Sequence, residues 1–146
     1  MAEEIENTVA PVEVAPEATP AKSKKKDKKR SVPAGQMHVV STFNNTIVTF
    51  SDKKGAALVT SSAGACGFRG SKKGTAYAAQ VAAEKAAEVA KSTFGMSSVD
   101  ILVKGIGLGR DSAIRAVNSF GIAINSIKDV TPIPHGGVRP KGQRKP

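Results

Sequence analysis

The sequence predicts an α/β fold in which a mixed five-stranded sheet carries two helices, in the order β-β-β-α-β-α-β. Three observations support this fold. Short stretches rich in β-branched residues alternate with turn residues before position 62. An alanine-rich stretch with helical periodicity then follows. Two later apolar stretches flank a short amphipathic segment, a pattern typical of strands joined by a helical crossover.

The first three strands are expected over residues 38–43, 46–51 and 56–61. Asn44 and Asn45 tolerate left-handed backbone and therefore suit a tight turn between the first two strands. Asp, Lys and Gly residues supply the next turn. This part of the chain is expected to form an antiparallel meander.

Two helices are expected, over residues 76–94 and 111–120. Thr75 is a suitable N-cap for the first helix, and Gly95 stands where a glycine often ends a helix. The last two strands are expected over residues 98–105 and 122–130. Antiparallel strands followed by crossover connections predict a ribonuclease H-like arrangement.

Charge divides the chain into a core and two tails. Residues 1–36 are expected to be a disordered extension, because an acidic head over 1–21 is followed by a self-repelling basic arm over 22–30. Residues 37–130 are expected to form the folded core. Residues 131–146 are rich in proline and basic residues and are expected to form an extended tail.

The net charge of +10 attracts polyanions and indicates a nucleic-acid partner. No apolar stretch is long enough to span a bilayer and no secretion signal opens the chain, so we expect a cytoplasmic protein without membrane contact. The single cysteine, Cys66, excludes an internal disulfide and has no metal-ligand partner at motif spacing. We therefore expect no metal and no cofactor.

The sequence argues against an enzyme. A two-metal nuclease needs convergent carboxylates, but the six acidic residues after position 30 are scattered over different elements. Neither glycine-rich loop has the spacing of a nucleotide-binding motif. His38 and His135 have no nucleophile at motif spacing, so no catalytic residue is expected.

Two glycine-rich basic loops, 64–74 and 105–110, each precede an expected helix. Flexible glycines let backbone N–H groups approach phosphates, and the positive end of the helix dipole adds to that attraction. The alternative is that the glycines serve turn geometry only. Phe68 and Tyr77 are suited either to stacking on an unpaired base or to burial against the sheet.

Five blocks, in the same order, resemble the bacterial form of the small-subunit ribosomal protein eleven family: residues 41–49, 61–64, 67–74, 113–116 and 129–135. The resemblance implies contacts with small-subunit ribosomal RNA and with neighbouring proteins on the platform of the subunit. It also implies a position at the cleft where the upstream part of messenger RNA pairs with the ribosomal RNA, in the cytoplasm, and no homo-oligomer.

The chain departs from the family pattern at a few positions. Ile106 stands where relatives often carry proline, and Asp111 replaces glutamate. Gly136 follows His135 where asparagine is common. The acidic head lies outside the family pattern.

These observations predict a structural RNA-binding protein, with a general single-stranded nucleic-acid chaperone as the alternative function. The expected RNA-binding residues lie in the turns, the basic loops and the C-terminal tail: Asn44, Asn45, Phe68, Arg69, Gly70, Ser71, Lys72, Lys73, Gly107, Gly109, Arg110, Pro134, His135, Gly136, Gly137, Arg139, Lys141, Arg144 and Lys145.

Overall fold

The computed structural model describes residues 31–139 and 141–143. The acidic head, the basic arm up to residue 30, Arg144 and Lys145 lie outside the described residues. The elements, in chain order, are β1 (Ala34–Ser41), β2 (Thr46–Asp52), β3 (Ala57–Ser62), the 3₁₀ helix η1 (Gly70–Gly74), α1 (Ala76–Phe94), β4 (Ser98–Lys104), α2 (Gly109–Ser119) and β5 (Ala123–Asp129). The order of strands and α-helices confirms the prediction.

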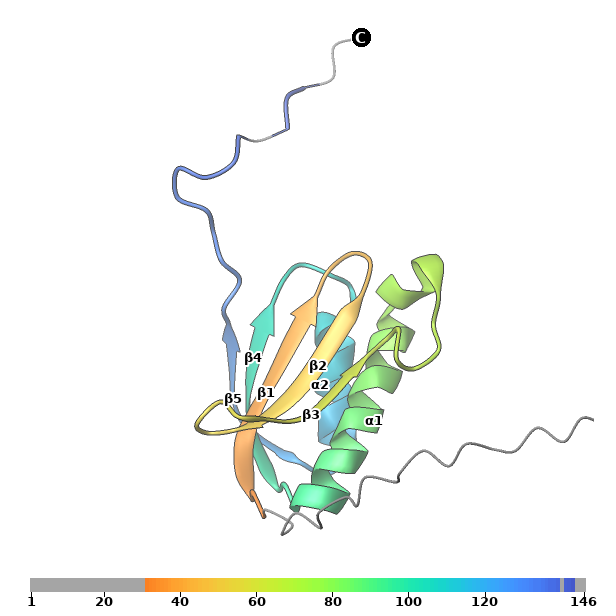
Figure 1. Cartoon of the computed structure of the whole chain (residues 1–146), viewed down its shortest axis with the longest axis vertical. Coiled ribbons are helices and arrows are strands. Elements are labelled where there is room, and N and C mark those ends of the chain that lie inside the picture. The colour runs from red at the N-terminus through yellow and green to blue at the C-terminus, as the bar shows by residue number, and fades with distance from the viewer. Residues whose placement is uncertain (1–30, 140, 144–146) are drawn as a thin grey trace, which may run out of the picture.

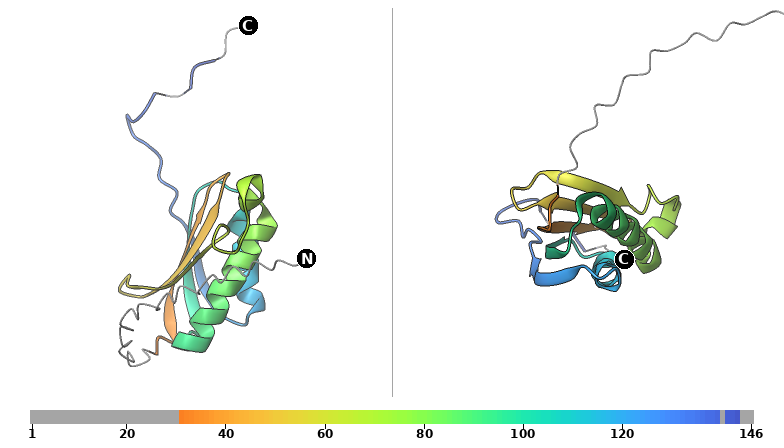
Figure 2. Two further views of the ribbon diagram at one scale, coloured as in Figure 1. Left: turned by 45° about the vertical axis from the view of Figure 1, so that its right-hand side comes forward. Right: turned by 90° about the horizontal axis from the view of Figure 1, so that it is seen from below.

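The five strands form one mixed sheet in the order β3-β2-β1-β4-β5. Strands β1, β2 and β3 pair antiparallel, whereas β4 pairs parallel with both β1 and β5. Both α-helices pack against the same face of the sheet and against each other (Figures 1 and 2). The domain therefore has two layers, and no helix covers the other face of the sheet within the part of the chain that is described.

The core lies between the sheet and the helices. Met37 and Val39 of β1 are level with Ile101 and Val103 of β4, because the two strands run parallel in register. The buried residues of α1 are all alanines: Ala78, Ala79, Ala82, Ala83, Ala86, Ala87 and Ala90. Since alanine is small, the helix axis can lie close to the sheet and to α2.

The predicted caps of α1 are confirmed. The side chain of Thr75 accepts a hydrogen bond from the backbone N–H of Ala78 at 3.3 Å. Gly95 ends the helix in the left-handed region with φ of 65°.

No helix in the described ranges is both long and apolar enough to cross a membrane.

The start and the end of β1 differ from the sequence prediction. The strand begins at Ala34 rather than residue 38, because Gly35 fits a space where a Cβ would collide with the Ser51 carbonyl oxygen. It ends at Ser41 because Thr42 closes a turn, with its N–H donating to the Asn45 carbonyl at 2.9 Å. Helix η1 was not predicted, and α2 begins two residues earlier than expected.

Candidate nucleic-acid interface

Three loops and the start of the C-terminal tail lie at one end of the sheet (Figure 1). Strands β1, β4 and β5 run parallel and all finish at this end, as the pairing of Val40 with Lys104 and of Val103 with Asp129 shows. We call this the loop end and define it by residues 42–45, 64–74, 105–110 and 131–139. All the predicted RNA-binding residues in the described ranges belong to it, except Lys141, which lies farther along the tail.

The backbones of three of these segments touch. The N–H of Gly107 donates to the Ser41 carbonyl at 3.0 Å. A Cβ at Gly74, Gly105 or Gly107 would lie closer than 3.0 Å to a backbone oxygen of residues 41–43. Close packing therefore accounts for the glycine at these positions.

Gly109 also has a packing role, because a Cβ there would lie 2.5 Å from the Cβ of Ala79. RNA contact by Gly107 and Gly109 stays a prediction. Gly70, in contrast, has φ of 55° and no atom within 4 Å of an added Cβ. Its backbone is open to a ligand, as the sequence-based interpretation of a phosphate-binding loop requires.

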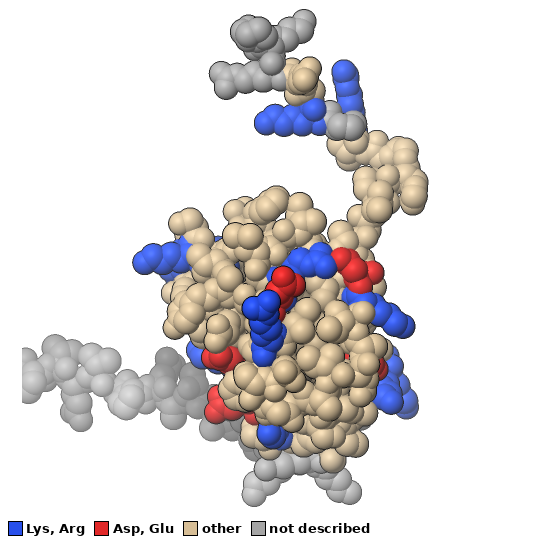
Figure 3. All heavy atoms as spheres, turned by 180° about the vertical axis from the view of Figure 1, so that it is seen from behind, with Lys and Arg blue, Asp and Glu red and all other residues tan. Residues whose placement is uncertain are grey.

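The basic residues of the 64–74 loop have no acidic partner among the described residues. Arg69 and Lys72 are exposed and Lys73 is half-buried. The one salt bridge in the described part of the chain joins two other residues, Arg110 and Asp129. In Figure 3, basic side chains over this loop stand at the upper left without acidic neighbours. The loop therefore offers full positive charges that the fold leaves uncompensated.

Arg110 has a different environment. Its guanidinium donates to the Gly105 carbonyl at 2.6 Å and to the Asp129 carboxylate at 2.5 Å. Thr131 donates its N–H to the same carboxylate at 2.9 Å, and its hydroxyl oxygen accepts from the N–H of Gly105 at 3.0 Å. We call Gly105, Arg110, Asp129 and Thr131 the clasp, because they fasten the start of the tail to the β4–α2 loop.

The clasp changes the electrostatics of its carboxylate. Hydrogen bonds from Thr131 and from Arg110 hold the pKa of Asp129 well below its usual value. Since Arg110 is engaged within the fold, contact between its charge and RNA stays a prediction.

The tail beyond the clasp runs away from the sheet in an extended path (Figure 1). Pro134, His135, Gly136 and Gly137 are exposed, and so are Arg139 and Lys141. Their backbone and side chains are therefore accessible to a partner.

The aromatic residues of the site pack on each other. The rings of Phe68 and Tyr77 lie edge to face, with centroids 5.8 Å apart and an interplanar angle of 87°. Phe68 is half-buried while Tyr77 stays exposed. Sequence reasoning missed a third aromatic residue, Phe43, which is exposed in the β1–β2 turn. The available signal was an aromatic side chain next to two asparagines in a turn.

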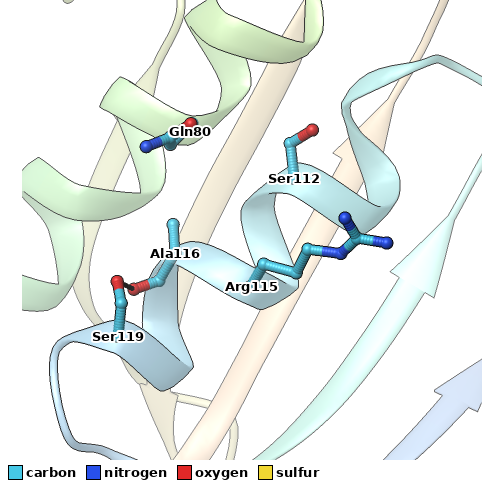
Figure 4. A pocket seen from close by; sticks show the side chains of 5 residues that line it. All are labelled: Gln80, Ser112, Arg115, Ala116 and Ser119. Atoms are coloured by element: carbon cyan, nitrogen blue, oxygen red, sulfur yellow. Dashed lines mark hydrogen bonds between the residues drawn. The ribbon is translucent and has the colours of Figure 1, made fainter.

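A groove of about 290 Å³ lies between α1 and α2 (Figure 4). Small and polar side chains line it together with one cation, Arg115. Within the described ranges, no three His, Cys, Asp or Glu side chains gather in a way that could hold a metal ion.

Comparison with known proteins gives one consistent result. The family model for ribosomal protein S11 matches residues 35–145. The chain is 52% identical over 128 residues to small ribosomal subunit protein uS11 of Nitratidesulfovibrio vulgaris (strain DSM 19637 / Miyazaki F). The same identity over the same length is found with the protein of that name from Francisella tularensis subsp. novicida (strain U112). Each alignment covers 88% of this chain and 98% of the relative.

Proposed function

Because the chain belongs to the ribosomal protein S11 family, we propose that its loop end binds the ribosomal RNA of the small subunit. The protein is a structural ribosomal protein of the small subunit and not an enzyme. The observation that carries the proposal is the set of cations Arg69, Lys72 and Lys73, which have no acidic partner among the described residues, on an open glycine-containing loop.

The physical basis of binding is phosphate neutralisation. Each phosphate contacted by a Lys or Arg releases condensed counterions, which drives association at moderate salt. The 64–74 loop leads directly into the N-terminus of α1, whose dipole adds a partial positive charge. Ser71 and Asn44 supply exposed polar groups beside the cations.

The extended tail adds a second contact. Arg139 and Lys141 are expected to bind phosphates, with His135 near a base or a backbone oxygen. The prolines limit the entropy that the tail loses on docking. The 64–74 loop and the C-terminal tail would thus contact RNA at the same end of the sheet.

Family membership supports finer proposals. We infer a place on the platform of the small subunit, beside neighbouring platform proteins. We also infer a position near the cleft where the upstream part of messenger RNA pairs with the ribosomal RNA. The protein would work in cytoplasmic ribosomes, as a single copy rather than a homo-oligomer.

A salt titration tests the proposal. Changing Lys72→Ala and Lys73→Ala together should weaken binding to small-subunit ribosomal RNA and make the dependence of log K on log salt shallower by about two. The matched control, Lys53→Ala with Lys54→Ala, removes the same charge from the β2–β3 turn at the opposite end of the sheet. If both lysine pairs reduced RNA affinity and the salt slope equally, binding would not be localised to the loop end.

The chaperone alternative predicts a different behaviour in ribosome assembly. A structural component should sediment stoichiometrically with small subunits after a high-salt wash, whereas a chaperone should dissociate. Loss of the protein from washed subunits would therefore favour the alternative.

A further inference from the structure

Three large apolar side chains are exposed on the β1–β2 and β4–α2 loops of the loop end. Phe43 is 68% exposed, Ile106 is 66% exposed and Leu108 is 75% exposed. We call these three residues the apolar tip. Exposed apolar side chains on neighbouring loops are a common mark of a binding surface.

The apolar tip is built on loops that touch each other. The Gly107 N–H, between Ile106 and Leu108, donates to the Ser41 carbonyl at 3.0 Å. On the other side, Gly74 packs against the carbonyl of Phe43. Phe43 therefore stands between the β4–α2 loop and the basic turn of η1.

The supporting turn has little freedom to withdraw these side chains into the core. Thr42 accepts hydrogen bonds through its hydroxyl oxygen from the N–H groups of Asn44 and Asn45, at 3.3 and 3.1 Å. Beneath the turn, Ser41 and Thr46 are buried and share a hydrogen bond of 3.2 Å. A surface fixed in this way loses little entropy when it binds.

We propose that the apolar tip takes unpaired bases of an RNA strand whose phosphates bind Arg69, Lys72 and Lys73. This inference rests on the proposed function and adds the class of RNA element that the site selects. A base face is apolar and stacks on aromatic and aliphatic side chains, whereas a continuous duplex hides its base faces within its own stack.

Charge complementarity favours a nucleic acid over a protein at this surface. Residues 42–45, 64–74 and 105–110 contain no aspartate or glutamate and carry four Lys and Arg residues. Three of these cations lie on the η1 side of Phe43, without acidic partners among the described residues. A single-stranded RNA offers base faces and phosphates in alternation, which matches apolar side chains beside cations.

A tryptophan probe tests the inference, because the natural chain has no tryptophan. We expect the emission of a Phe43→Trp variant to be quenched by a stem-loop RNA and not by the same stem made as an uninterrupted duplex. The control is Val89→Trp, on the exposed surface of α1 and 43% exposed, whose emission should not change. Equal quenching of Phe43→Trp by both RNAs would overturn the inference.

Affinity measurements separate the tip from the cations. Phe43→Ser should weaken binding to the stem-loop about tenfold, as expected for a lost base-stacking contact, without changing the salt dependence. Ile106→Ser with Leu108→Ser should likewise weaken binding to the stem-loop without changing the salt dependence. Lys72→Ala with Lys73→Ala should change the salt dependence for stem-loop and duplex alike.

The outcomes are distinguishable. If Lys72→Ala with Lys73→Ala weakens RNA binding while the tip variants bind the stem-loop with normal affinity, the inference fails and the proposed function stands. If the tip variants bind RNA normally but do not enter small subunits, a protein occupies the tip and the inference is wrong. If neither set affects RNA binding, the proposed function itself is wrong. Unchanged circular dichroism in the tip variants shows that the fold is intact.

Discussion

Gly107 offers a direct test of whether the glycines of the 105–110 loop serve packing or phosphate approach. A Cβ at this position would collide with the carbonyl oxygen of Thr42 and with the hydroxyl of Ser41. The Thr42 oxygen belongs to the backbone, so a rotamer change cannot relieve that collision, and the Ser41 hydroxyl can move only by leaving its hydrogen bond to Thr46. We expect Gly107→Ala to destabilise the fold.

The size of the effect follows from two contributions. Forcing an extra carbon into packed structure costs roughly 1–3 kcal/mol. Displacing the Ser41 hydroxyl also disturbs its buried hydrogen bond to Thr46, at about 1 kcal/mol. The sum, about 3 kcal/mol, is a large part of the 5–15 kcal/mol of stability usual for a domain, so the variant folds but unfolds earlier.

The assay is urea unfolding followed by circular dichroism, in which the midpoint should fall while the m-value stays constant. The matched control is Gly64→Ala, whose Cβ would meet only Lys73 Cδ at 3.7 Å and Ser62 Oγ at 3.9 Å. It should change stability by no more than about 0.5 kcal/mol. If Gly107→Ala unfolds like the natural protein but binds RNA less tightly, the glycine serves phosphate approach and our reasoning is refuted.

Three further predictions concern the clasp, the tail and catalysis. Because the pKa of Asp129 is lowered on folding, its contribution to stability is fully present above about pH 4 and is lost as pH falls towards the folded value. Asp129→Asn should therefore flatten the acid part of a plot of urea midpoint against pH and leave the shape between pH 5 and 8 unchanged. Removal of residues 132–146 keeps Thr131, so the core should melt normally while incorporation into small subunits, measured by sedimentation, falls. Purified protein should not cleave RNA with or without Mg²⁺; cleavage lost in Asp100→Asn would contradict a purely structural role.

Local signals explain why most of the fold was predictable from the sequence. The cap at Thr75 and the terminating Gly95 depend on residues within one helical turn, so the bounds of α1 were found without tertiary information. The start of β1 was missed because Gly35 weakens a strand by propensity. Only the close approach of Ser51 from the neighbouring strand gives that glycine a role.

The candidate site was less predictable because its contacts are distant in sequence. Arg110 looked like a phosphate anchor, since a cation follows glycines at the start of a helix. Its partner Asp129 is brought beside it by the pairing of β4 with β5, which no local pattern encodes. Phe43 was missed because burial, and not residue type, decides whether an aromatic side chain is available to a ligand.

The two glycine-rich basic loops therefore have different physical roles although their sequences look alike. In the 64–74 loop the cations have no acidic partner within the described part of the chain and Gly70 is open, whereas in the 105–110 loop the glycines are packed and the cation is paired. Arg110→Lys separates charge from geometry, because lysine keeps the charge but cannot donate from two guanidinium nitrogens to Gly105 and Asp129 at once. We expect the variant to unfold at lower urea while the salt dependence of RNA binding is unchanged. A shallower salt dependence in Arg110→Gln, which removes the charge, would instead identify Arg110 as a phosphate contact.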